Sequence, residues 1–354
     1  MDVFEAMEDL SCQQVVFCHD KATGLKAIIA FHDTTLGPAL GGCRMRNYAG
    51  EEEALMDVLR LAQGMTFKSS IAGLDFGGGK AVIWGNPQEK SEPMLRAMGR
   101  FVEGLKGRII TGTDMGTAPE DFAFMGKETR YLTSLPEEMG GRGDPSLMTA
   151  TGVFHGVRAC LEEVYGSDSL EGKTVSIQGV GKVGRHLGQM LQKEGARIIV
   201  CDPAAECLNT AREELHCQSV SPDEIYEVEA DIFSPNAVGG ILNDNTISRL
   251  KSKIIAGAAN NQLAEDRHGK MLWEKGILYA PDFVINAGGL INVAAEYLQE
   301  SEEKVDFQVR KIYDALKKIF EVARERNLPT CDVAEILAME RVDLIGKTRK
   351  IYVG

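Results

Sequence analysis

The spacing of apolar side chains in the first third of the chain predicts a mixture of helices and strands. Between Glu51 and Met65, apolar residues recur at intervals of three and four, as on one face of a helix: Leu55, Val58, Leu59 and Ala62. A second helix is expected around residues 91–105. Short apolar runs predict strands at residues 14–18, 25–30, 80–85 and 108–110.

A different pattern follows the segment 140–146, which is rich in glycine, contains one proline and predicts a linker. Beyond it, short apolar strands alternate with helical stretches. Strands are expected at residues 174–178, 197–201, 232–233, 253–256 and 277–280, and long amphipathic helices at 305–327 and 332–345. Alternation of this kind is typical of a parallel, doubly wound sheet.

Composition narrows the class of protein. A chain of 354 residues is long for one domain, and a length of this order favours about two. The net charge of −13 argues against nucleic acid or an anionic membrane as the main partner. No apolar run approaches the ~20 residues that a membrane-spanning helix needs. We therefore expect an α/β protein that binds neither nucleic acid nor membrane.

The eight cysteines are scattered, with no CxxC pair and no spacing typical of a metal site. We find no signal peptide ahead of them, so they are expected to be reduced thiols of a cytoplasmic protein. No metal is predicted.

A nucleotide-binding motif opens the second pattern: Gly179-Val180-Gly181-Lys182-Val183-Gly184. It follows a predicted strand and precedes a predicted helix at 182–193, the context in which GxGxxG binds a dinucleotide. The first glycine would allow a tight turn, the second a close approach of backbone to pyrophosphate, and the third close packing of helix on strand. The alternative is a glycine turn in an α/β domain that binds no nucleotide.

Asp202 follows the next strand, close to the ~20-residue offset expected for an acid that binds the adenosine ribose. Its carboxylate would accept hydrogen bonds from the ribose hydroxyls and repel a 2′-phosphate. Residues 203–205 contain no arginine that would accommodate that phosphate. The sequence therefore predicts NAD rather than NADP.

Lysines framed by glycine and apolar residues stand in the first domain. Lys80 closes the run Gly77-Gly78-Gly79-Lys80, which predicts a glycine bend, and Lys68 lies twelve residues upstream. An ordinary solvated lysine after a glycine turn is the alternative for Lys80 alone. Together with Asp114, at the end of a predicted strand, the two lysines suit an amino acid: one cation for its carboxylate and one for chemistry at its amine.

Several longer motifs resemble the glutamate/leucine/phenylalanine/valine dehydrogenase family, in order and over nearly the whole chain. They are Leu40-Gly41-Gly42-Cys43-Arg44-Met45, Glu51-Glu52-Glu53-Ala54-Leu55, Met65-Thr66-Phe67-Lys68, Gly77 to Val82, Gly257 to Leu263, and Ala280 to Gly289. The motifs are most similar to those of the leucine-specific branch. The resemblance implies a mixed α/β substrate and oligomerisation domain (residues 1–138 and 330–354), a Rossmann NAD-binding domain (139–329), and a catalytic cleft between them.

The resemblance also implies roles for individual residues. Lys68, with backbone at Gly41 and Gly42, would bind the substrate carboxylate; Lys80 would be the general base, and Asp114 would relay protons. Met65 and Asn261 would contact the substrate. The cofactor would contact the glycine motif (Gly179, Val180, Gly181, Lys182, Val183 and Gly184), Asp202, Thr149, Ala237, Ala258 and Asn260.

Substrate choice is predicted from the position before the two glycines. Glutamate-specific relatives place a lysine there, whereas this chain has Leu40, so a substrate carboxylate would lose its partner. Leu40, Gly112, Leu290 and Val293 resemble an apolar side-chain pocket, which favours leucine, valine or isoleucine. The chain departs from the leucine-specific pattern at Thr151, Leu290, Asn236 and Gly112. Gly112, smaller than the usual alanine, would offset the larger Leu290. Phenylalanine is therefore the alternative substrate.

The expected reaction is reversible oxidative deamination to a 2-oxo acid and ammonia, and the resemblance further implies a homo-oligomer, an octamer. Two rival functions are weighed. A non-catalytic NAD-binding regulator would be favoured by loss of Lys80 or Asp114, and both are present. A hydroxy-acid dehydrogenase would need a histidine, arginine and carboxylate set near the cofactor, which we cannot assemble from this sequence.

Overall fold

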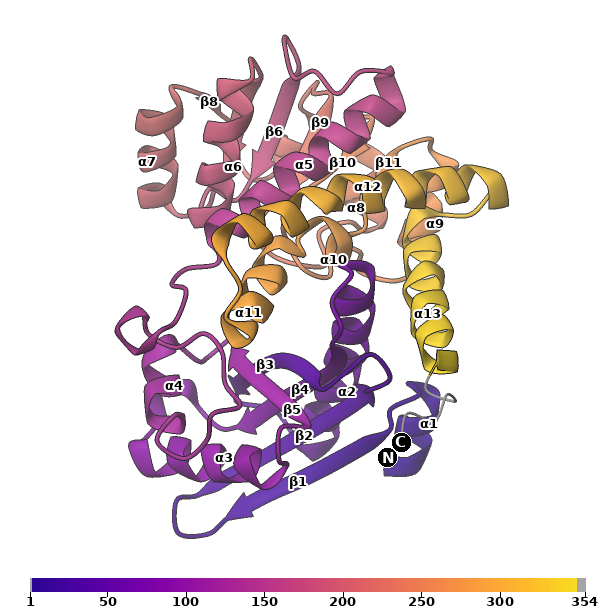
Figure 1. The fold of residues 1–354 in the computed structure, drawn as a ribbon. Helices are drawn as coiled ribbons and strands as arrows, with labels where there is room; N and C mark the ends of the chain where they lie inside the picture. The colour runs from indigo at the N-terminus through magenta and orange to yellow at the C-terminus, as the bar shows by residue number, and fades with distance from the viewer. Residues whose placement is uncertain (1, 349–354) are drawn as a thin grey trace. The chain divides into compact units, whose positions relative to one another are not determined.

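The computed structural model describes residues 2–348 and divides them into two compact units (Figure 1). Unit 1 comprises residues 2–143, 292–301 and 338–348, and unit 2 comprises 144–291 and 302–337. The expected α/β class with two units is confirmed. Each unit is built on its own sheet, and no helix among the described residues is long and apolar enough to cross a membrane.

Unit 1 is built on a five-stranded mixed sheet in the order β1-β2-β4-β3-β5. Its strands are β1 (Gln14–Asp20), β2 (Leu25–Asp33), β3 (Ala39–Arg46), β4 (Gly77–Trp84) and β5 (Ile109–Thr113). The strand β3 lies between β4 and β5 and is parallel to both. Its helices from the first segment are α1 (Val3–Asp9), α2 (Glu51–Ile71), α3 (Glu92–Gly104) and α4 (Pro119–Met125).

Alternation along the strands gives this sheet two apolar faces, as a sheet covered on both sides requires. On one face, Ile28 and Val82 pack with Val58, Leu59 and Ala62 of α2. On the other face, Ile29 and Ile83 of the same two strands pack with residues of α3 and α4: Leu95, Met98, Val102, Phe122 and Met125. The side-chain period of two therefore sends neighbouring residues into separate cores.

Unit 2 is a Rossmann fold. All pairs in its six-stranded sheet are parallel, in the order β11-β10-β9-β6-β7-β8. The strands are β6 (Thr174–Gln178), β7 (Arg197–Cys201), β8 (Gln218–Ser219), β9 (Ile232–Pro235), β10 (Ile254–Ile255) and β11 (Leu278–Tyr279). The chain starts at the centre with β6, proceeds outward to β8, and returns to β9 on the other side. This reversal leaves a crevice at the carboxyl ends of β6 and β9, where such folds bind ligands.

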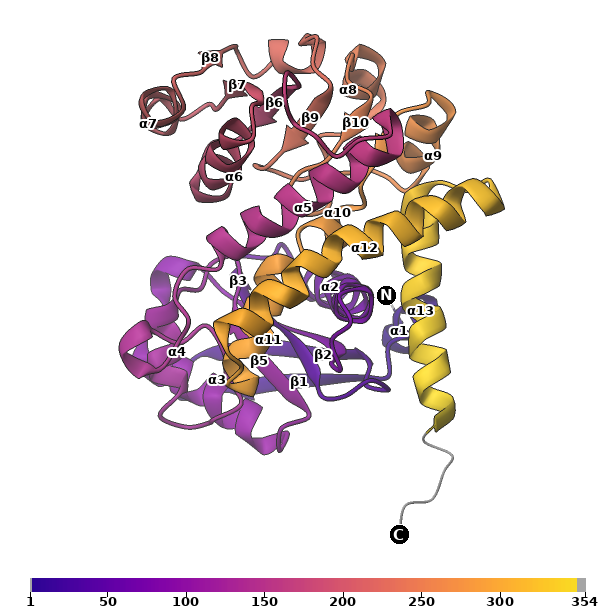
Figure 2. The ribbon, with the colours of Figure 1, turned by 45° about the horizontal axis from the view of Figure 1, so that its top comes forward.

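Helices connect and cover the strands of unit 2: α5 (Ser146–Tyr165), α6 (Lys182–Lys193), α7 (Ala205–Leu215), α8 (Asp244–Arg249), α9 (Arg267–Glu274) and α10 (Asp282–Ile285). Three more follow: α11 (Gly288–Leu298), α12 (Glu302–Arg326) and α13 (Thr330–Thr348). The long helices α5 and α12 lie side by side (Figures 1 and 2). Glycines on α5 allow this, since a Cβ at Gly152 would meet Ile312 at 2.8 Å.

Several predicted elements are confirmed with their bounds, including both first strands of unit 2 (174–178 and 197–201) and the helix 182–193. Two expectations were wrong. The three glycines before Lys80 do not form a bend, because Gly77–Trp84 is one buried strand with Lys80 inside it. The helix that begins at Glu51 continues six residues past Met65 to Ile71, so Lys68 lies within it.

Close packing explains why the first half of β4 is glycine. A Cβ on Gly78 would overlap Thr66 and the Ala62 carbonyl of α2, and a Cβ on Gly79 would lie 2.7 Å from that of Ala39. A Cβ on Gly41 of β3 would in turn overlap the Gly79 carbonyl. Helix and strands therefore approach here to a distance that only bare backbone permits.

A late segment of the chain belongs to unit 1 because of its hydrogen bonds to residues of the first segment. The Glu296 carboxylate accepts hydrogen bonds from the backbone N–H groups of Leu135 and Arg142, at 3.1 and 3.2 Å. Residues 292–301 therefore belong to unit 1, although the predicted boundaries placed them in the second domain. The first boundary lies at 143/144, five residues from the predicted 138/139.

The return of the chain to unit 1 involves the second half of α13. Ser70 donates a hydrogen bond to the Ala338 carbonyl, and the Arg341 guanidinium pairs with Asp75 at 2.6 Å. Unit 1 resumes at residue 338, whereas the predicted return began at 330. Residues 349–354 of that predicted segment lie outside the described residues.

We predict that Gly78→Ala destabilises the protein by about 3 kcal/mol or more, because the added methyl forces α2 away from β4. Gly64→Ala, on the same helix, is the matched control. A Cβ there meets no atom within 4 Å, so the substitution should stabilise by about 0.5–1 kcal/mol. Denaturant unfolding measures both. Equal stability of Gly78→Ala and the wild type would contradict the packing explanation.

Candidate active site

An ion pair between the buried Lys80 and the partly buried Asp114 forms the centre of the unit 1 site. Lys80 projects from β4 and is 5% exposed, and its Nζ donates a hydrogen bond to Oδ2 of Asp114, which follows β5. The strand between them, β3, contributes Gly42, where a Cβ would lie 2.9 Å from the Asp114 Cβ. The predicted pair is thus brought together across three adjacent strands, against backbone that has no side chain.

Two cations hold the Asp114 carboxylate in its ionised form. Burial alone would raise its pKa, but Lys80 and then Arg44 outweigh burial and lower the pKa from 3.8 to about 2. Arg44 donates from Nε to Oδ1 of Asp114 at 2.9 Å. The carboxylate is therefore an acceptor on both oxygens and carries its negative charge at neutral pH.

The other predicted carboxylate-binding groups lie on β3 and α2. Gly41 faces α2 closely, since a Cβ on it would lie 3.3 Å from the Met65 Cγ. Lys68 is half-buried and lies in the last turn of α2, three residues beyond Met65. Gly41, Met65 and the Lys80 pair therefore gather at one part of unit 1, and Lys68 stays a predicted substrate ligand.

The residues predicted to line the side-chain pocket do not all belong to the same unit. Leu40 on β3 is 1% exposed and pairs with Ile110 of β5 in the sheet, while Gly42 pairs with Gly112. Val293 belongs to unit 1, and Leu290 belongs to unit 2. Leu40 on β3 and Gly112 on β5 therefore lie on neighbouring strands of the same sheet as Lys80.

Gly112 does not enlarge this pocket in the way the sequence suggested. A Cβ on it would lie 2.8 Å from the Ser134 hydroxyl and would also meet that of Thr133, so these groups fill the space. Thr133 was missed by sequence reasoning. Its buried hydroxyl has no hydrogen-bond partner within residues 2–348, while its backbone N–H donates to the Thr111 carbonyl of β5 at 2.9 Å, beside an isolated bridge between Leu132 and Thr111. No local motif signals that long-range pairing.

The glycine motif of unit 2 lies at the carboxyl end of β6 and fits a dinucleotide. Gly179 has a φ of +89°, and a Cβ on Gly184 would overlap the Gly179 carbonyl. Gly181 begins α6 without a side-chain cap, and a Cβ on it would meet nothing within 4 Å. The first turn of α6 therefore offers uncapped backbone N–H groups and open space, as a bound pyrophosphate requires.

Asp202 follows the next strand, β7, and its carboxylate binds the backbone of the glycine turn. Its Oδ2 accepts a hydrogen bond from the Val180 N–H at 2.9 Å, and its Oδ1 accepts one from Ala204 at 2.8 Å. The side chain of Ala237, in the loop after β9, packs against Gly179, where a Cβ would approach to 2.7 Å. These predicted cofactor residues therefore meet at the crevice between β6 and β9.

Side-chain amides hold residues 257–262, part of the Gly257 to Leu263 motif, in shape. Asn236 accepts a hydrogen bond from the Ala258 N–H at 2.9 Å, and Asn286 donates to the Ala258 carbonyl and, at 2.7 Å, to Asn260 Oδ1. Gln262 donates to the carbonyls of Gly257 and Ala259. Sequence reasoning noted Asn236 only as a departure from a family pattern. The structure gives it a supporting role that neither spacing nor composition signals.

The remaining predicted cofactor residues, and the predicted substrate residue Asn261, also belong to unit 2. The Thr149 hydroxyl donates to the Pro145 carbonyl at 3.0 Å and lies against Gly289. Lys182 is exposed and pairs with Asp144, and Val183 follows it in the first turn of α6. Asn261 is exposed, with a φ of +51°. Their contacts to substrate or cofactor stay predictions.

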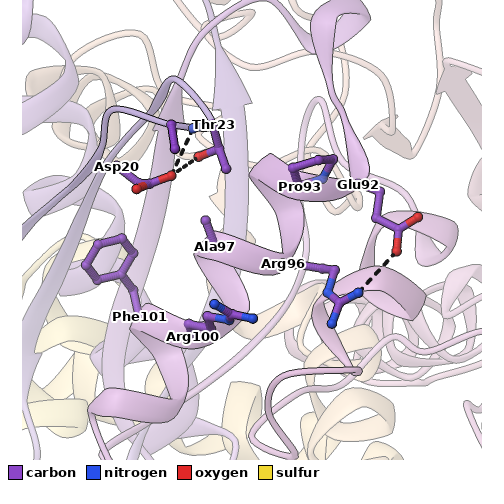
Figure 3. A pocket seen from close by; sticks show the side chains of 9 residues that line it. Asp20, Thr23, Glu92, Pro93, Arg96, Ala97, Arg100 and Phe101 are labelled. Carbon is purple, nitrogen blue, oxygen red and sulfur yellow. Dashed lines mark hydrogen bonds and ion pairs between the residues drawn. The ribbon is translucent and has the colours of Figure 1, made fainter.

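Neither the Cys43 thiol nor a cavity in unit 1 has a role in the predicted chemistry. Burial, and after it the charge of Asp114, raise the pKa of Cys43 to about 12, so this thiol stays protonated beside the site. A cavity of about 680 Å³ opens on unit 1 between α3 and the β1–β2 turn (Figure 3) and contains none of the predicted residues. The described residues include no cluster of His, Cys, Asp or Glu able to hold a metal ion.

We predict that Asp114→Asn flattens the pH dependence of stability between about pH 4 and pH 2. The folded pKa of Asp114 is depressed, so its contribution is complete above the ordinary value of 3.8 and is lost as pH falls through about 2. The contribution is on the order of 2 kcal/mol. Denaturant unfolding over this pH range measures it, and parallel curves for variant and wild type would contradict the ion-pair account.

Comparison with known proteins agrees with this geometry. Residues 12–131 match the family model for the Glu/Leu/Phe/Val dehydrogenase dimerisation domain, and residues 140–210 and 204–349 match that for Glutamate/Leucine/Phenylalanine/Valine dehydrogenase. A leucine dehydrogenase of Thermoactinomyces intermedius is 52% identical over 99% of this chain and 96% of its own length. A phenylalanine dehydrogenase of Caldalkalibacillus thermarum is also 52% identical, over 96% of this chain and 94% of its own.

A solved structure gives the same result for the fold. The L-tryptophan dehydrogenase of Nostoc punctiforme superposes with a TM-score of 0.89 at 45% identity, covering 98% of this chain and 100% of its own. The resemblance inferred from the motifs is therefore confirmed. The chain belongs to the Glu/Leu/Phe/Val dehydrogenase family and is an NAD(P)-dependent amino acid dehydrogenase.

Proposed function

We propose that the protein catalyses the NAD-dependent, reversible oxidative deamination of branched-chain L-amino acids to 2-oxo acids and ammonia. The observation that carries the proposal is the buried Lys80–Asp114 pair beside the bare backbone of Gly42. A lysine kept away from water and oriented by a carboxylate is suited to proton transfer at a substrate amine.

The proposed mechanism divides the work among residues of unit 1. Lys68, with backbone at Gly41 and Gly42, binds the substrate carboxylate and thereby places Cα. The glycine motif would hold NAD, which would supply the hydride acceptor for Cα. Lys80 then takes a proton from the water that attacks the resulting imine carbon, and Asp114 orients Nζ and relays the proton. Collapse of the carbinolamine releases ammonia and the 2-oxo acid.

This chemistry requires the substrate Cα to reach the nicotinamide, so the cleft expected between the domains stays a necessary prediction of the proposal. On the unit 2 side, Thr149, Ala237, Ala258 and Asn260 are the residues proposed to contact the cofactor. Asn261 and Leu290 are proposed to contact the substrate.

The apolar Leu40 supports an apolar substrate. A distal carboxylate placed against this buried side chain would have no cationic partner, at a cost of several kcal/mol. Leucine, valine and isoleucine differ by single methyl or methylene groups, each worth only about 1–3 kcal/mol. Phenylalanine is the second candidate substrate, because the chain is as similar to a phenylalanine dehydrogenase as to a leucine dehydrogenase.

Asp202 supports NAD over NADP, because its carboxylate stands at the end of β7, where the adenosine ribose binds in Rossmann folds. We further propose a homo-octamer in the cytoplasm. The family resemblance supports assembly, and the eight free cysteines, all within the described residues, suit a reducing compartment.

We predict that the wild type reduces NAD with leucine, valine or isoleucine and that Lys80→Ala lowers kcat by about 10²–10⁴-fold. Lys68→Ala should act mainly on KM, because it removes carboxylate binding, and Lys21→Ala, an exposed lysine, is the control. NADH absorbance measures each rate, with phenylalanine and a 2-hydroxy acid in the same panel. An active Lys80→Ala, or a wild type that oxidises only the hydroxy acid, would refute the mechanism.

We also predict that Asp202→Asn raises the ratio of kcat/KM for NADP to that for NAD by about tenfold, a change of ~1.4 kcal/mol. The amide oxygen can still accept the Val180 N–H, while the negative charge that repels a 2′-phosphate is removed. Initial rates with each cofactor at saturating amino acid give the ratio. An unchanged ratio would mean that Asp202 does not select the cofactor.

A further inference from the structure

A chain of charged side chains continues from the Lys80–Asp114 pair into unit 1. Arg44 donates from Nε to Asp114 and from its Nη1 nitrogen to both oxygens of Asp57, at 3.1 and 3.0 Å. Tyr48 donates its hydroxyl to Asp57 at 2.6 Å. The series Lys80–Asp114–Arg44–Asp57–Tyr48 therefore joins β4, the end of β5, β3 and α2.

The network leaves Asp114 no freedom to rotate. Its Oδ2 accepts from Lys80, while its Oδ1 accepts from Arg44 at 2.9 Å and from the Met115 N–H at 2.6 Å. Arg44 is itself fixed at both ends, and the side chains of Arg44 and Asp57 are only 15% and 21% exposed. A rigid guanidinium shared by two carboxylates holds the inner one at a defined angle to Nζ.

We propose that Arg44, held by Asp57 and Tyr48, is the positioning residue that fixes the Asp114 carboxylate and sets the pH at which the Lys80–Asp114 pair releases its proton. This inference rests on the function proposed above. Arg44 contacts neither substrate nor cofactor in the proposed mechanism and acts through Asp114.

The signs of the surrounding charges decide the direction of each effect. Asp114 faces Lys80 from β4, and Arg44 and the Cys43 thiol from β3, with Asp121 of α4 beyond that thiol. Asp57 and Tyr48 lie on the far side of Arg44, and burial followed by Asp57 raises the pKa of Tyr48, so its hydroxyl stays neutral. The positive charge of Arg44 therefore favours proton release from the pair, and the negative charge of Asp57 opposes it.

The test is the pH profile of kcat/KM for the best amino acid substrate, measured on the full-length protein. Arg44→Met should move the midpoint of the rising limb to higher pH by about one unit, because a cation next to the pair is lost. Asp57→Asn should move it in the opposite direction. Arg44→Lys should retain the midpoint, since the charge remains, but lower kcat about tenfold, because one ammonium cannot hold two carboxylates.

Arg96→Met is the matched control. Arg96, on α3, donates to Glu128 at 2.6 Å in an arginine–carboxylate pair that shares no residue with the series from Lys80 to Tyr48, so its loss should leave midpoint and kcat unchanged. Thermal unfolding of each variant confirms that it is folded. If Arg44→Met does not fold, the remaining two variants still decide the question, because Arg44→Lys should keep the midpoint and lose kcat, whereas Asp57→Asn should lower the midpoint.

Profiles that superimpose for the wild type, Arg44→Met and Asp57→Asn would overturn the inference, as would midpoints that move in the same direction. An inactive wild type, or an active Lys80→Ala, would instead overturn the proposed function. The two failures are therefore distinguishable in one set of measurements.

Discussion

The cost of burying a lysine is the constraint on which the rest of unit 1 depends. A charged ammonium that is 5% exposed is stable only if a carboxylate lies against it, and the carboxylate must in turn be held in place. Bare backbone at Gly41, Gly42, Gly78 and Gly79 lets the strands and α2 come close enough for that contact. The glycines, the ion pair and the arginine behind it are therefore one physical arrangement.

Much of the fold could be predicted from sequence, because its signals are local. The strand, turn and helix around Gly179 to Gly184 follow from the spacing of apolar side chains and from short-range sterics at the glycines. The structure gives this strand and this helix the bounds that were predicted. The family motifs likewise pointed to Lys80 and Asp114, whose side chains the structure brings into contact. Both inferences rest on motifs of consecutive residues, which can be recognised without knowing the contacts between distant segments.

What the sequence could not predict depends on contacts between distant segments. Three glycines in a row are typical of a turn, yet Gly77–Gly79 are strand because they pair with β2 and β3 in the sheet while α2 packs closely on Gly78. The hydroxyl of Thr133 fills the space beside Gly112, so a smaller residue there did not mean a larger pocket. Asn236 and Asn286 shape the loop at Ala258 through side-chain amides that no periodicity reveals.

The segmented composition of unit 1 has a consequence for synthesis on the ribosome. The Ser70 hydroxyl donates to the carbonyl of Ala338, a residue 268 positions later in the chain. At about 5–20 residues per second, on the order of tens of seconds pass between their translation. During that interval the first 143 residues lack both later segments that complete their unit. Until the last helix emerges, unit 1 of the nascent chain is therefore incomplete, and incompletely packed domains are prone to aggregate.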